Sequence, residues 1–211
     1  MSSAPGAPPA RSRLVAECAG LFVGVPLAIA AGWSGRPVLP FLWLAALGCG
    51  VALFRDPSFD RRAMWRASAV PKFGRTLLAR SFAAAALLLA LAWWLNPAGF
   101  LALPRERPVL WTLIVVLYPV LSVYPQELIF RAFFAHRYRA LFGEGAGMVT
   151  AGAAAFALVH VVFRSPWAFA LTAVAGLALA DTYRRTRSLA ACSLEHALYG
   201  AWVFTAGLGP H

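Results

Sequence analysis

Seven mostly apolar segments follow one another along the chain, and each is close to the length of about 20 residues that an α-helix needs to cross a bilayer. The segments cover residues 14–33, 38–54, 77–95, 109–124 continued by 127–142, 147–163, 167–183 and 188–208. This pattern predicts an all-α, polytopic bundle of about seven to eight transmembrane helices. The count is eight if a proline break divides the fourth segment in two.

Composition excludes an ordinary soluble domain. Charged residues make up 13% of the 211 residues, whereas about 25% is typical of soluble proteins. The mean hydropathy is +0.68. The formal net charge of +11 could suggest nucleic acid as a partner. However, the basic residues lie between the apolar segments and form no patch with interleaved aromatic residues, which argues against nucleic-acid binding.

The basic residues instead predict topology, because Lys and Arg collect in short cytoplasmic loops. Residues 55–75 contain six basic and two acidic residues, and Arg184–Arg187 forms a second basic loop. Together with Arg11 and Arg13, these loops place the N-terminus in the cytoplasm. We therefore expect a multi-pass protein of a bacterial-type inner membrane, surrounded by lipid.

The domain organisation expected from this pattern is simple. Residues 1–13 are rich in Pro, Ala and Ser and predict a disordered tail. Residues 14–208 form a single transmembrane domain. The triplet Ala28-Ile-Ala30 resembles a signal-peptide cleavage site, but the length of the first segment and the spans that follow favour an uncleaved helix.

Two ionisable residues lie inside the fourth apolar segment. An unpaired charge at the bilayer centre costs at least ~2.5–3.5 kcal/mol, so Glu127 and Arg131 should face protein or a wet cavity. Being four residues apart on one helix face, they can pair. Pro119 and Pro125 predict a kink or break of the helix just before them.

Three polar side chains from different spans fall at a similar depth. With a rise of 1.5 Å per residue, Glu127 lies about 15–18 Å, His160 about 20 Å and His196 about 13 Å from the nearest basic loop. A carboxylate with an imidazole can deprotonate a water, and a second imidazole can donate to a developing oxyanion. The three therefore predict hydrolysis within the bilayer without a cofactor, while the same set could instead bind zinc.

Structural roles are the alternatives for each polar residue. Glu127 with Arg131 could be a structural ion pair, and His160 could be a packing histidine. Glu195 points about 100° away from its neighbour His196 on a helix, which favours a contact with another helix. Glu17 and Arg80 lie near helix ends and are expected to extend toward the interface.

Three motifs resemble the CPBP group of intramembrane proteases, which includes CAAX proteases and bacteriocin-processing or abortive-infection proteins. The motifs are Gln126-Glu-Leu-Ile-Phe-Arg131, Phe156-Ala-Leu-Val-His160 and His196-Ala-Leu-Tyr-Gly200, similar to the family's Glu-Glu-x-x-x-Arg, Phe-x-x-x-His and His-x-x-x-Asn. The resemblance covers about residues 109–208, which it implies to be the protease core. It implies an intramembrane endopeptidase of glutamic or metal-dependent type that cleaves a membrane peptide or protein.

Two positions depart from the family pattern. Gln126 stands where the first glutamate is expected, and an amide cannot accept a proton at neutral pH; Gly200 stands where the asparagine is expected. We therefore expect Glu127 to act as general base with His160, His196 as oxyanion donor, Arg131 to orient Glu127, and Gln126 to be a polar site residue. Tyr199 is a candidate replacement donor.

The same departures motivate a different class of function. A catalytically weakened membrane protein of the same fold could act as a binding or immunity module. A small transporter that uses Glu127 as a proton relay is a third class, disfavoured because the sequence shows no internal repeat.

Overall fold

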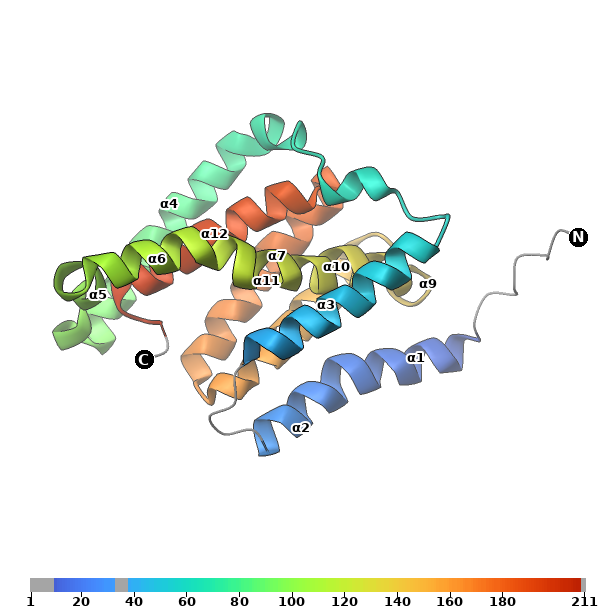
Figure 1. The fold of residues 1–211 in the computed structure, drawn as a ribbon, viewed down its shortest axis with the longest axis horizontal. Coiled ribbons are helices and arrows are strands. Elements are labelled where there is room, and N and C mark those ends of the chain that lie inside the picture. The colour runs from blue at the N-terminus through green and yellow to red at the C-terminus, as the bar shows by residue number, and fades with distance from the viewer. Residues whose placement is uncertain (1–9, 33–37, 210–211) are drawn as a thin grey trace, which may run out of the picture.

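The computed structural model describes residues 10–32 and 38–209, and every regular element within them is a helix (Figure 1). The predicted all-α class is therefore confirmed. The predicted tail lies largely outside the described residues, and the first helix already begins at Arg11. The principal helices are α1 (Arg11–Ala19), α2 (Val25–Gly32), α3 (Val38–Arg55), α4 (Ala69–Leu95), α5 (Ala102–Glu106), α6 (Pro108–Tyr118), α10 (Ala146–Val159), α11 (Pro166–Thr186) and α12 (Leu189–Ala206).

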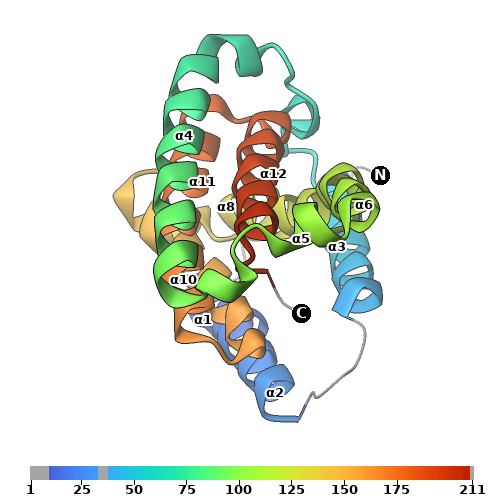
Figure 2. The ribbon, with the colours of Figure 1, turned by 90° about the vertical axis from the view of Figure 1, so that its left-hand side faces the viewer.

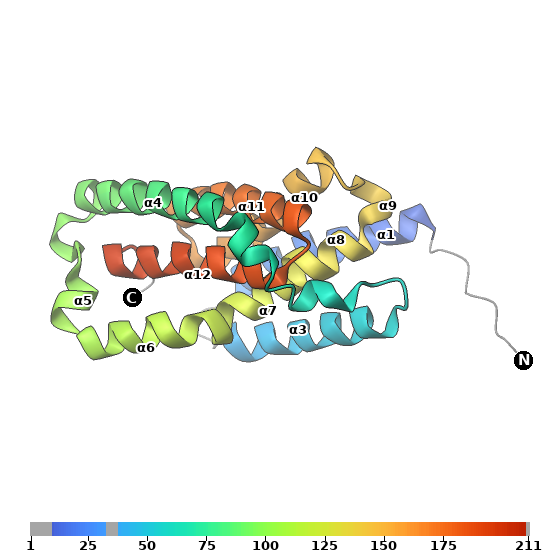
Figure 3. The same ribbon diagram turned by 90° about the horizontal axis from the view of Figure 1, so that it is seen from above.

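Five helical stretches are long and apolar enough to cross a membrane: Arg11–Gly32, Val38–Arg55, Ala69–Leu95, Pro108–Arg137 and Ala146–Phe163. The last two predicted spans form α11 and α12, which are 21 and 18 residues long but less apolar. Helix α12 lies in the middle of the bundle, between α4 and α6 (Figures 2 and 3). A helix that is surrounded by protein has less need of an apolar surface, which explains why its sequence carries polar residues.

Of the predicted kink or break at the prolines, the break is wrong, because the helix continues from Pro108 to Arg137. It does so through two π-helical turns, η4 (Pro119–Val123) and η5 (Leu128–Phe133), separated by α7 (Tyr124–Glu127). A proline lacks a backbone donor and crowds the preceding turn, and a locally wider turn relieves both defects. The stretch ends in α8 (Phe134–Arg137), and the short helix α9 (Arg139–Phe142) follows it.

The basic segments gather at one end of the bundle. Four polar contacts join them across the sequence: Arg137 with Glu17 (2.6 Å), His136 with Asp56 (2.9 Å), Ser188 with the carbonyl of Arg66 (2.8 Å), and Arg187 with Glu144 (3.4 Å). We call this the basic end. The predicted loops therefore lie on a common side of the molecule, as a positive-inside distribution requires.

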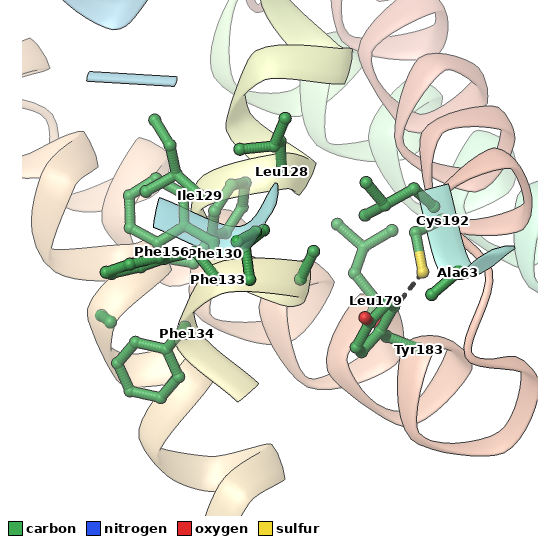
Figure 4. Packing of buried hydrophobic residues seen from close by; sticks show 14 of the residues in the cluster. Ala63, Leu128, Ile129, Phe130, Phe133, Phe134, Phe156, Leu179, Tyr183 and Cys192 are labelled. Carbon is green, nitrogen blue, oxygen red and sulfur yellow. Dashed lines mark hydrogen bonds between the residues drawn. The ribbon is translucent and has the colours of Figure 1, made fainter. Parts of the chain in front are cut away.

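The core beneath this end is aromatic. Phe130 of η5 packs edge-on against Phe156 of α10, with ring centroids 5.5 Å apart, and Phe133 and Phe134 belong to the same cluster (Figure 4). All six residues of η5 are buried, so this turn is enclosed by protein. The outer surface is apolar in contrast, with Val109, Phe82 and Leu44 each more than 65% exposed. An apolar exterior around a bundle with polar residues inside identifies an integral membrane protein.

The contact between Asp56 and His136 gives a prediction about pH. Hydrogen bonds from the His136 ring and from Ser58 lower the pKa of Asp56 to about 2, from an ordinary value of 3.8. A carboxyl with a lowered pKa stabilises the fold above pH 3.8, and this contribution is lost as the pH falls toward 2. Because Asp56 is 43% exposed, Asp56→Asn should cost less than about 1 kcal/mol at neutral pH.

Thermal unfolding in detergent across this pH range measures the effect. The difference in unfolding temperature between wild type and Asp56→Asn should shrink as the pH approaches 2. The control Glu106→Gln, at an exposed carboxylate, should have the unfolding temperature of wild type at every pH. If the difference in unfolding temperature stayed constant with pH, the ionised Asp56 carboxylate would not be the stabilising group.

Candidate active site

The centre of the candidate site is Glu127, the last residue of α7, whose side chain is fully buried. Its Oε1 accepts a hydrogen bond from Nδ1 of His196 at 2.8 Å, and its Oε2 accepts one from Nε of Arg131 at 3.1 Å. The first contact joins residues that are 69 positions apart, as their similar predicted depth suggested. The second is the predicted pair along one helix face. Both carboxylate oxygens are thus occupied.

Arg131 connects Glu127 to α10. Its side chain is 1% exposed, its guanidinium lies 5.0 Å from the ring centroid of Phe156, and Nη1 donates to the carbonyl of Gly152 at 3.4 Å. Nη2 is buried and has no hydrogen-bond partner among the described residues. Arg131 also lines a small hollow of about 20 Å³, which is bordered as well by Glu144 and Arg187 of the basic end.

His196 of α12 is held at both ring nitrogens. Besides the contact with Glu127, its Nε2 lies 3.1 Å from the hydroxyl of Tyr118 on α6. When Nδ1–H is donated to the carboxylate, Nε2 is left as an acceptor, and the Tyr118 hydroxyl is placed to donate to it. The result is a continuous chain from Tyr118 through His196 and Glu127 to Arg131.

Tyr118 fits beside α12 because residue 200 has no side chain. A Cβ added at Gly200 would lie 2.2 Å from Cε1 and 2.8 Å from the hydroxyl oxygen of Tyr118. The glycine that departs from the motif is therefore compensated in space by a tyrosine from another helix. Sequence reasoning missed Tyr118, whose one distinguishing feature was a polar group within an apolar segment.

The candidate donor Tyr199 has a different contact. Its hydroxyl donates to Glu195 at 2.7 Å, on the side of α12 away from His196. Glu195 also accepts from Thr182 at 2.5 Å and from Arg80 at 3.4 Å, as the predicted orientation toward a neighbouring helix required. The expectation that Arg80 extends toward the interface is wrong, because its guanidinium turns into the bundle and also binds Asp181 at 2.9 Å.

Neither His160 nor Gln126 forms one of the hydrogen bonds of the Glu127 carboxylate, whose partners are Arg131 and His196. The Nδ1 of His160 donates to the carbonyl of Phe156 at 2.7 Å, and its Nε2 has no partner among the described residues. His160 nevertheless packs against the same Phe156 ring as His196, with ring centroids 4.6 and 5.4 Å from it. The Gln126 amide donates to the Ser122 hydroxyl at 2.8 Å on its own helix, because successive residues diverge by about 100°.

The alternative zinc site would need Glu127, His160 and His196 to converge. Within residues 10–32 and 38–209, no three His, Cys, Asp or Glu side chains are grouped as metal ligands. Glu127 and His196 engage each other with atoms that they would offer to a metal. The described residues therefore contain no preassembled three-ligand site.

Because Gly200 lies so close to the Tyr118 ring, we predict that a methyl group at position 200 destabilises the protein. Gly200→Ala should lower the free energy of unfolding by about 1–3 kcal/mol, because the Tyr118 ring must move away from α12. The same change should cost much less in a Tyr118→Ala background. Gly74→Ala is the matched control, since nothing lies within 4 Å of its added Cβ. Equal costs in both backgrounds, measured by chemical unfolding, would show that the two residues are not in contact.

Comparison with known proteins supports the resemblance seen in the motifs. Residues 107–202, just under half of the chain, match a family model described as type II CAAX prenyl endopeptidase Rce1-like. The matched segment runs from α6 into α12 and contains all three motifs as well as Tyr118. No curated protein and no solved structure matches the chain.

Proposed function

We propose that this membrane protein, whose residues 107–202 match the Rce1-like endopeptidases, is an intramembrane endopeptidase that hydrolyses a bond in a membrane-associated peptide or protein. The observation that carries the proposal is the buried contact between Glu127 and His196. A carboxylate that orients an imidazole within a membrane span is arranged for proton transfer. The family description names a prenylated substrate class, and for this chain we propose a membrane-associated peptide substrate.

His196 is the best-placed base. Its Nδ1–H is fixed by Glu127, and Nε2 takes a proton from water once the Tyr118 hydroxyl turns from Nε2 to the substrate, while the carboxylate stabilises the imidazolium that forms. Glu127, expected to be the base itself, is fully buried with both oxygens occupied. We therefore assign it an orienting role, with Arg131 holding its other oxygen.

The neighbouring groups complete the proposed reaction. The water oxygen attacks the peptide carbonyl carbon as its proton passes to Nε2 of His196, and the Tyr118 hydroxyl donates to the oxyanion that develops. The second hydrogen of the water stays on its oxygen and is hydrogen-bonded to Nε2 of His160. The proton on His196 then passes to the amide nitrogen as the peptide bond breaks, which releases an amine and a carboxylic acid; the acid loses its proton to solvent, and His196 is neutral again.

Three substitutions test these roles in a cleavage assay with a membrane-embedded peptide. His196→Ala should reduce the rate by about 10²–10⁴-fold, as removal of a general base does. Glu127→Gln should also reduce it strongly by disturbing the imidazole. Tyr118→Phe removes one oxyanion donor and should cost up to about 10²–10³-fold.

Glu106→Gln, at an exposed position outside the site, is the control and should retain activity. Thermal unfolding of each variant shows whether a loss of activity comes from the missing catalytic group or from unfolding of the protein. Wild-type rates in folded His196→Ala and Glu127→Gln proteins would refute the proposed mechanism.

Dependence on a metal ion is tested separately. If the Tyr118–His196–Glu127 chain performs the reaction, cleavage should continue at an unchanged rate after incubation with a strong chelator. Loss of activity that is restored by added zinc would instead assign Glu127, His160 and His196 to a metal site assembled on binding.

A non-catalytic binding or immunity module is the second candidate. The observation that favours it is the Gln126 amide, which turns onto Ser122 and leaves the first motif position without a carboxylate near His160. A peptide that purified wild-type protein binds but leaves intact would support this candidate. Turnover that depends on His196 would exclude it.

A further inference from the structure

A second hollow lies at the basic end, away from the residues assigned to catalysis. It has a volume of about 270 Å³ and lies where α4 begins and α11 ends. Its lining contains no acidic residue and consists of Arg66, Ser68, Ala69, Lys72, Phe73, Arg185 and Thr186. Three of the seven side chains are cationic, so the hollow attracts an anion.

The neighbouring carboxylates compensate this charge only in part. Arg66 forms an ion pair with Asp60, and Arg185 pairs with Asp181 at 2.8 Å. Asp181 also accepts hydrogen bonds from two further arginines, so one negative charge is shared among three guanidinium groups. Lys72 has no hydrogen-bond or ion-pair partner among the described residues, and its exposed ammonium group is available to a ligand.

The donors at the hollow suit a phosphate group. Ser68 and Lys72 are four residues apart on one face at the start of α4, and the Ser68 side chain does not cap its own helix. Hydroxyl, ammonium and guanidinium groups together make charge-assisted hydrogen bonds to phosphate oxygens. We propose that this hollow binds the phosphate of an anionic lipid headgroup.

The position in the fold favours a lipid over a soluble anion. The hollow lies at the end of the span Ala69–Leu95, beside a loop in which Trp65 is 70% exposed, as is typical of the membrane interface. Further along α4, Leu78 and Phe82 are 56% and 70% exposed and offer an apolar surface for acyl chains. Basic pockets between membrane helices are known to take acidic lipid headgroups.

Native mass spectrometry and thermal unfolding of the full chain test the proposal. Wild-type protein should retain phosphatidylglycerol in preference to phosphatidylcholine, and nanodiscs that contain phosphatidylglycerol should raise its unfolding temperature. Lys72→Gln should weaken phosphatidylglycerol binding about fivefold, the contribution of one basic residue near an anionic surface. Lys72→Arg should retain it.

Arg107→Gln is the matched control, because Arg107 is an exposed cation at the start of the span that reaches the basic end at Arg137. Equal binding by Lys72→Gln and wild type, or equal losses in Lys72→Gln and Arg107→Gln, would overturn the proposal. Inorganic phosphate is the probe for a soluble ligand. If millimolar phosphate stabilised the protein in a Lys72-dependent way and displaced the lipid, the hollow would be a site for a soluble anion instead.

Discussion

The ion pair between Glu127 and Arg131 is the constraint on which the bundle depends. Two charges in a membrane span are tolerable only when they are paired and enclosed by protein. The η5 turn that carries Arg131 is therefore buried on every side, and α3, α10 and α12 pack around it. Because Arg131 occupies one carboxylate oxygen, the other remains an acceptor, and α12 supplies His196 to it. The arrangement of the central helices thus follows from neutralising one carboxylate.

Small residues let the surrounding helices come close enough to achieve this enclosure. A Cβ at Gly176 of α11 would lie 3.1 Å from the Cα of Ala153 on α10, so the two backbones are nearly in contact. Gly200 plays the same part for α12, where the Tyr118 ring occupies the space of the missing side chain. Close approach through small residues is the usual means of packing helices within a membrane, where no hydrophobic force drives them together.

Three features were predictable because each follows from the order of residues along the chain: the helical class, the concentration of basic loops at one end, and the pairing of Glu127 with Arg131. The contact of Glu127 with His196 could be anticipated from depth, which places residues along the membrane normal but not around it. For the same reason His160, at a suitable depth, turned out to bond its own helix. No local sequence pattern encodes how the helices are rotated relative to one another. The π-helical turns, the direction of the Arg80 side chain into the bundle and the contact of Tyr118 with His196 all depend on that rotation.

The rotation of α12 is fixed by two polar groups on different faces of the helix. Glu195 is tied to Arg80 of α4 and Thr182 of α11, while the next residue, His196, is tied to Glu127 and Tyr118. Rotating α12 about its axis in either direction would break one set of these hydrogen bonds. A buried polar group without a hydrogen-bond partner destabilises the protein, so the rotation is disfavoured. The imidazole is therefore held in one orientation before any substrate arrives. Such preorganisation suits the proton transfer that we propose for His196, because no free energy is then needed to align the imidazole during the reaction.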